Sequence, residues 1–208
     1  MNNLALAVTL AIASLGAAQA QEPVPAAAPV PGYVVVDPLA KPLRFVIGAG
    51  LTHGGDKLAT QYYEEDFSID LNGGDSIALL AGLDYRINQQ FSVQGTIGYH
   101  FDDASARNGS MRFERIPLEL LGYYHVNDQV RVGGGIRHVT NAEFRSGGAS
   151  DIGDYRFDDS TGAVAELEYM YSHRIGFKLR WANDEFKEKR SRIPVKGDHL
   201  GLLVNFYF

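Results

Sequence analysis

Charged side chains recur at every second position in several segments of the chain, where they could form ion pairs, a gate or a path for ions. Seven are basic and four are acidic, and they alternate with apolar neighbours: Arg44, Asp84, Arg86, Arg115, Glu119, Arg131, Arg137, Glu166, Glu168, Lys178 and Arg180. A buried charge costs several kcal/mol unless it is paired. If these side chains share an interior, the sequence predicts a cross-strand ion network.

Eight segments with a two-residue period must position these charges. Each is roughly ten residues long and places apolar and polar side chains on opposite faces, as β-strands do. They cover residues 43–51, 76–86, 91–100, 115–124, 130–137, 162–169, 175–181 and 200–208. The sequence therefore predicts an all-β fold.

The connections between these segments alternate in length. Residues 53–74, 101–111, 140–160 and 184–197 are long and polar, whereas residues 87–90, 126–129 and 172–174 are short and contain turn-forming residues such as Asn88 and Asn127. Long loops at one end and short turns at the other predict an antiparallel up-and-down meander.

The first 42 residues differ from the rest. Residues 1–20 are mostly apolar and end in Ala18-Gln19-Ala20, which predicts a secretory signal peptide. Residues 21–42 are rich in Ala and Pro and predict an extended tether. The chain of 208 residues has no Cys, so neither disulfides nor thiolate metal sites are expected. Its net charge of −6 argues against a nucleic-acid partner.

The apolar face of the strands could meet either a soluble core or lipid. Export and the aromatic residues near strand ends, among them Tyr85, Phe91, Tyr124 and Trp181, favour lipid. Strands in a bilayer must close on themselves because no backbone edge can face hydrocarbon. The predicted fold is an eight-stranded antiparallel transmembrane β-barrel over residues 43–208. A soluble lipocalin-like barrel is the alternative.

The C-terminal segment, Leu200 to Phe208, and the segment Arg115-Ile-Pro-Leu-Glu-Leu-Leu-Gly122 resemble small outer-membrane β-barrel domains of Gram-negative bacteria, of the OmpA-type and porin-like group. This resemblance covers about residues 43–208. It implies an outer-membrane location with the tether in the periplasm and the long loops outside. It also implies that Phe206 and Phe208 are an assembly signal for the barrel-assembly machinery. Membrane lipid and lipopolysaccharide are the expected partners of a monomer.

A second, shorter resemblance concerns catalysis. Arg137 to Ala142 is similar to the His-x-Ser-Asn-Ala stretch of lipid A 3-O-deacylase barrels, in which His activates a hydroxyl. His138 and Thr140 are the matching candidates here. Thr replaces Ser, three strands follow instead of one, and no Glu stands at the matching later spacing. We therefore expect no enzyme.

Eight strands leave an interior just wide enough for side chains to fill. We expect a structural or surface-interaction role with a polar, filled interior. A narrow channel for ions or small solutes is the first alternative, and a lipid A-modifying, deacylase-like enzyme is the second. No cofactor or metal is expected, because the six His residues fall on separate segments without ligand spacing. The basic residues of segment 186–196 are candidates to contact lipopolysaccharide phosphates.

Overall fold

The computed structural model describes residues 41–208 except 63–67, 107–108, 149–152 and 191. The predicted signal peptide, residues 1–20, and all but the last two residues of the predicted tether, residues 21–42, lie outside the described part. They therefore stay predictions.

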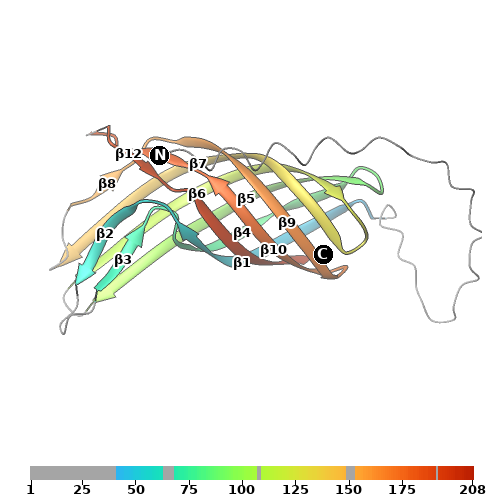
Figure 1. The fold of residues 1–208 in the computed structure, drawn as a ribbon, viewed down its shortest axis with the longest axis horizontal. Helices are drawn as coiled ribbons and strands as arrows, with labels where there is room; N and C mark the ends of the chain where they lie inside the picture. The colour runs from blue at the N-terminus through green and yellow to red at the C-terminus, as the bar shows by residue number, and fades with distance from the viewer. Residues whose placement is uncertain (1–40, 63–67, 107–108, 149–152, 191) are drawn as a thin grey trace, which may run out of the picture. The chain divides into compact units, whose positions relative to one another are not determined.

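Eight long strands form one antiparallel barrel (Figure 1). They are β1 (Leu43–Gly54), β4 (Ser76–Arg86), β5 (Phe91–Ala106), β6 (Gly109–His125), β7 (Val130–Gly148), β9 (Ser160–Ser172), β10 (Ile175–Asn183) and β13 (His199–Tyr207). Each strand pairs with the next of the eight, and β1 pairs with β13, so the sheet closes. The predicted eight-stranded up-and-down barrel is confirmed.

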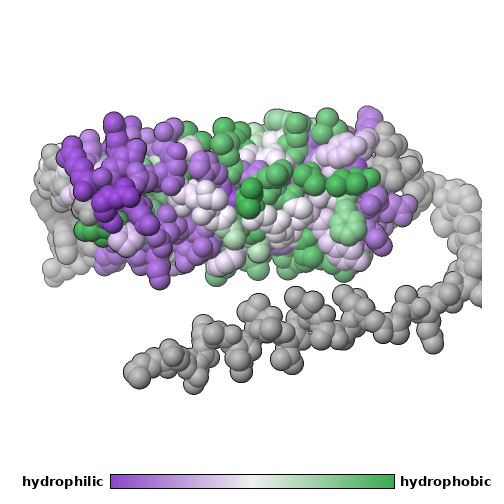
Figure 2. Space-filling model, turned by 90° about the horizontal axis from the view of Figure 1, so that it is seen from above, coloured by the Kyte–Doolittle hydropathy of each residue, from purple (hydrophilic) through white to green (hydrophobic). Residues whose placement is uncertain are grey.

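The two faces of the strands have the polarity of a membrane barrel. Apolar side chains such as Phe45, Leu120 and Leu179 point outward and are about half exposed, at 47%, 54% and 48%. Figure 2 shows hydrophobic residues around the middle of the barrel and hydrophilic residues gathered toward one end. Charged side chains such as Arg131 and Glu168 are fully buried inside. This arrangement is the reverse of a soluble core and fits a bilayer.

Short turns close one end of the barrel, which we call the short-turn end. The Asn88 side chain accepts hydrogen bonds from the backbone N–H groups of Gln90 and Phe91, both at 2.8 Å. Asn127 accepts the same pair of bonds from Gln129 and Val130. Asn side chains stabilise tight turns in this way, which confirms the turns expected at these positions.

The opposite end, which we call the loop end, contains more regular structure than the sequence predicts. β5, β6 and β7 continue well beyond the apolar band, so residues 101–106 and 109–111 are strand rather than loop. Segment 53–74 contains the hairpin of β2 (Lys57–Tyr62) and β3 (Ser68–Asn72). β8 (Tyr155–Arg156) pairs with β7, and β11 (Glu185–Lys187) pairs with β12 (Pro194–Lys196). Strand pairing continues there because buried aromatic side chains support it, as described below.

Candidate functional site

Buried ion pairs begin near the short-turn end of the interior. Asp84 on β4 accepts a hydrogen bond from Arg44 on β1 at 2.6 Å and another from Arg131 on β7 at 2.7 Å. Arg131 also donates to Glu168 on β9 at 2.8 Å. The Tyr207 hydroxyl donates to Glu168 at 2.6 Å and accepts from Arg131 at 2.7 Å. Arg44–Asp84 and Arg131–Glu168 join neighbouring strands. The Arg131–Asp84 contact and the two contacts of Tyr207 join strands that are not neighbours, so these three cross the interior.

The ion pairs continue toward the loop end. Glu166 on β9 lies 2.7 Å from Lys178 Nζ and 2.5 Å from Arg180 Nη2, both on β10. Arg180 reaches Glu119 on β6 at 2.6 Å, across the interior. Glu119 also pairs with Arg137 at 2.6 Å. Every one of these side chains is at most 2% exposed, so all five are buried in the interior of the barrel.

Ten side chains thus form one continuous series of opposite charges, which we call the ion-pair chain. It contains five cations and five anions: Arg44, Arg131, Lys178, Arg180 and Arg137 with Asp84, Glu168, Glu166, Glu119 and Asp184. Strand register places several pairs directly opposite each other, for example Lys178 with Glu168 and Arg180 with Glu166. Directly opposed residues are the closest side-chain neighbours in an antiparallel sheet.

Two predicted members, Arg86 and Arg115, do not join the ion-pair chain. Arg86 ends β4 at the short-turn end, where it donates to the carbonyls of Asn88 and Gln89 and contacts His125. Arg115 lies nearer the loop end, where it donates to the carbonyl of Gly73. Alternation predicts the face of each side chain correctly, but neither lies at a height where a carboxylate of the ion-pair chain can pair with it.

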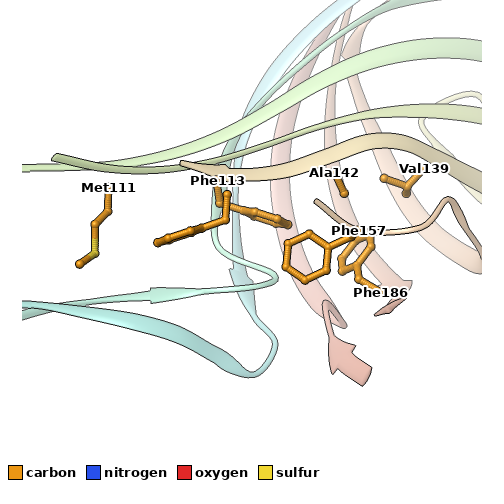
Figure 3. Packing of buried hydrophobic residues seen from close by; sticks show 7 residues of the cluster. Met111, Phe113, Val139, Ala142, Phe157 and Phe186 are labelled. Atoms are coloured by element: carbon orange, nitrogen blue, oxygen red, sulfur yellow. The ribbon is translucent and has the colours of Figure 1, made fainter. Parts of the chain in front are cut away.

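A cluster of aromatic side chains is buried at the loop end (Figure 3). The rings of Phe113, Phe157 and Phe186 pack mutually with centroids 5.8–6.2 Å apart. Met111, Val139, Ala142 and Phe144 complete this buried cluster, which we call the loop-end cap. The Arg115 guanidinium lies 5.5 Å from the Phe113 ring centroid and 5.6 Å from that of Phe186. Cation–π contacts with Arg115 therefore help to stabilise the cap.

The sequence predicts the ion-pair chain better than the loop-end cap. Asp184, Tyr123 and Tyr207 complete the polar contacts but are not among the predicted residues. Tyr207 alternates with the outward Phe206 and Phe208, so the two-residue period does indicate its inward orientation. The cap residues Phe144, Phe157 and Phe186 fall in polar segments, where isolated Phe residues give no clear period.

His138 and Thr140 do not contact each other. The His138 ring faces outward, and its Nδ1 lies 2.9 Å from the hydroxyl of Thr161 on β9. The Thr140 hydroxyl instead donates to the carbonyl of Ile116 at 3.3 Å. The segment that resembles the deacylase motif therefore does not bring His138 and Thr140 into contact.

Phe206 on β13 and Phe208 directly after it, the predicted assembly signal, point outward and are 43% and 69% exposed. Their position leaves both rings accessible from outside the barrel.

Asp102, inside the loop-end extension of β5, has an unusual ionisation. Burial, reinforced by the negative charge of Asp75, raises the pKa of Asp102 to about 6. On the outer wall, by contrast, a hydrogen bond from Arg145 lowers the pKa of Glu143. Asp102 is therefore a carboxyl whose charge changes with pH near neutrality.

No protein-family model and no curated protein matches the sequence. Solved structures do match. Ail, the attachment invasion locus protein of Yersinia pestis, in complex with the heparin analogue sucrose octasulfate, matches with a TM-score of 0.50 and 15% identity, covering 80% of this chain and 99% of that chain. Another Ail structure gives 0.49 at 12% identity, with coverages of 80% and 97%. Neisserial surface protein A gives 0.48 at 12%, with coverages of 80% and 97%.

These identities are too low to transfer a task, because one fold hosts many functions. The match to the sucrose octasulfate complex of Ail, over 99% of that chain, shows the arrangement of the strands and no more. The chain has the fold of the small eight-stranded outer-membrane β-barrels.

Proposed function

We propose that this protein is a monomeric outer-membrane barrel that acts by interactions at its surface and neither conducts solutes nor catalyses a reaction. Its loop end faces the outside and its N-terminal tether lies in the periplasm. Outer-membrane lipid and lipopolysaccharide surround it, and the barrel-assembly machinery inserts it. The observation that carries this proposal is an interior closed twice, by the ion-pair chain and by the loop-end cap.

The ion-pair chain argues against the narrow channel. Arg180 and Glu119 meet across the interior at 2.6 Å, as do Arg131 and Asp84 at 2.7 Å. Separating either pair would leave charges in a poorly solvated interior, at a cost of about 3–5 kcal/mol. A conducting path would have to break such contacts and also part the rings of the cap.

The loop end is the part of the molecule best suited to interactions. The strand extensions and the β2–β3 and β11–β12 hairpins project beyond the apolar band. Their charges are mixed: Arg192 pairs with Asp158, and Lys187 lies 3.8 Å from Glu185. Leu58 of β2 and Val195 of β12 pack against the loop-end cap. This packing fixes the position of the hairpins, so the surface is preorganised for a partner.

Planar bilayer recording tests this proposal. Purified protein that shifts on a heat-modifiability gel is folded, and we expect such protein to give no unitary conductance steps. Arg137→Gln, which removes one cation of the ion-pair chain, serves as the comparison. Steps in the wild type that change in amplitude with Arg137→Gln would establish a channel and overturn the proposal.

A further inference from the structure

The outer wall of the barrel contains a polar cavity at the edge of the apolar band. It has a volume of about 400 Å³ and lies where the pairing of β6 with β7 shifts register between Glu114 and Ile116. On β7, Asn141 adopts a left-handed backbone conformation with φ of 53°. Bulges of this kind redirect side chains and recur beside functional sites. Among the residues lining this wall cavity are Glu114, Asn141, Glu143, Arg145, Arg156 and Lys189.

An apolar furrow lies on the same wall, within the apolar band. Its volume is about 440 Å³, and Ile97, Leu118, Leu120 and Ile136 line it. Gly95 lies among these residues, and a Cβ there would meet only the Glu119 carbonyl, at 4.0 Å. The furrow is therefore open to the hydrocarbon side, and no packing requires glycine at position 95.

The two cavities follow each other along the strands. On β5, Tyr99 lines the wall cavity and Ile97 lines the furrow. On β6, Ile116 and Leu118 stand in the same relation. Such residues are successive outward positions, about 7 Å apart along a strand. The furrow therefore begins where the wall cavity ends.

The wall cavity offers spare hydrogen-bond donors. Arg145 donates to Glu143 at 2.9 Å and lies 3.4 Å from Glu114. Arg156 reaches Glu143 through Nε alone, at 3.2 Å, among the described residues. A guanidinium has five N–H donors and an ammonium has three, so Arg156 and Lys189 keep donors for a ligand. Three carboxylates line the cavity, Glu114, Glu143 and Asp159, against four cations, Arg115, Arg145, Arg156 and Lys189. Arginine already engages Glu114 and Glu143, so the lining as a whole is basic and favours an anionic ligand.

We propose that the wall cavity and the furrow together bind one phosphorylated glycolipid of the outer leaflet. Its phosphate accepts hydrogen bonds from Arg156 and Lys189, its sugar hydroxyls contact Asn141 and Glu143, and one acyl chain lies in the furrow. Guanidinium groups match phosphate oxygens in charge and geometry. Placing the site in the outer leaflet rests on the proposed orientation, with the loop end outside.

Native mass spectrometry of the whole barrel in dodecyl maltoside tests this site, with bisphosphorylated hexa-acyl lipid A as the probe. We expect lipid A to bind at least tenfold more tightly than phosphatidylethanolamine. The double variant Arg156→Gln/Lys189→Gln should weaken lipid A binding about tenfold through loss of charge-assisted hydrogen bonds. Both side chains are on the exposed surface, so folding should not suffer.

Gly95→Leu fills the furrow and should also weaken lipid A binding about tenfold, because it displaces buried acyl surface. Gly122→Leu is its matched control, since a Cβ at Gly122 meets nothing within 4 Å and Gly122 lies outside this furrow. Lys187→Gln is the control for charge, and both controls should bind as the wild type does.

Three results would overturn the site: equal affinity for both lipids, tighter binding of phosphatidylethanolamine, or unchanged lipid A binding in the Arg156→Gln/Lys189→Gln variant. The assay uses protein in detergent, so its outcome does not depend on conductance or on orientation in the cell. A failed lipid site would leave the proposed surface role standing, and a conducting barrel would leave the lipid site standing.

Discussion

Arg180 on β10 and Glu119 on β6 form an ion pair at 2.6 Å across the interior of the barrel. The same carboxylate also pairs with Arg137 on β7, and the same guanidinium pairs with Glu166 on β9. Four strands are thus tied together through two residues. Loss of either would affect the whole barrel rather than one hairpin.

Replacing Glu119 by alanine should therefore destabilise the protein strongly. The change leaves both Arg137 and Arg180 without their shared partner in a buried site, which costs about 3–5 kcal/mol of unfolding free energy. Urea unfolding in lipid vesicles, followed by tryptophan fluorescence of Trp181, measures the change. Glu185→Ala is the control, because its pair with Lys187 is about half exposed and should contribute at most about 1 kcal/mol. Similar losses in the two variants would contradict a structural role for the ion-pair chain.

The loop-end cap predicts a more local effect. Phe186 is fully buried against Phe113 and Phe157, and replacing such a ring by alanine typically costs about 3–5 kcal/mol. Because the cap lies beyond the apolar band, Phe186→Ala should loosen the loop end while the membrane strands stay folded. Limited trypsin digestion should cut the variant faster near Lys187 and Lys189, yet the heat-modifiable band should persist. Tyr155→Ala, at an exposed ring on the edge of the cap beside Phe144, should be cut much more slowly than Phe186→Ala. Unchanged digestion of Phe186→Ala would show that the cap does not hold the loop end.

The barrel itself is predictable because a two-residue period reports directly which face each side chain occupies. That period alone assigns Arg131, Glu166 and Lys178 to the interior, where all three are buried. It does not report height along the barrel axis, which depends on strand tilt and stagger. For this reason the period predicts the correct face for Arg86 and Arg115. It wrongly includes them in the ion network, whereas both donate to backbone carbonyls.

The loop end is less predictable for a different reason. Phe157 and Phe186 are 29 residues apart in sequence, and their contact depends on the tertiary structure of the folded barrel. Neither segment alone has enough apolar residues to indicate a core. The wall cavity likewise depends on the register shift near Glu114 and the backbone of Asn141, which depend on tertiary pairing rather than on a local pattern.

The raised pKa of Asp102 predicts that stability depends on pH. In the unfolded chain this carboxyl ionises near its ordinary value of 3.8, whereas the folded protein holds its proton up to about pH 6. The folded state therefore binds more protons in this interval, so the contribution of Asp102 to stability falls as pH rises from about 4 to about 6. Asp102→Asn, which mimics the protonated form, should be more stable than the wild type at pH 7.5 and equally stable at pH 4.

Urea unfolding midpoints of both proteins at the two pH values measure this difference. The neighbouring Asp103→Asn is the control, because Asp103 is exposed and lies 3.8 Å from Arg112, so its loss should not stabilise the protein at pH 7.5. An Asp102→Asn variant that is less stable than the wild type at pH 7.5 would mean that the ionised carboxylate has a favourable partner.

Labelling of single introduced cysteines can determine the orientation of the barrel in the membrane, because the chain contains no cysteine of its own. Arg190 is exposed at the loop end between β11 and β12, and Gln89 is exposed in a short turn at the opposite end. With the loop end outside, a membrane-impermeant maleimide should label Arg190→Cys on intact cells and leave Gln89→Cys unlabelled. Permeabilising the outer membrane should then allow both to react, which shows that each thiol is reactive. Labelling of Gln89→Cys alone on intact cells would invert the proposed orientation. It would also place the wall cavity at the inner leaflet, away from lipopolysaccharide.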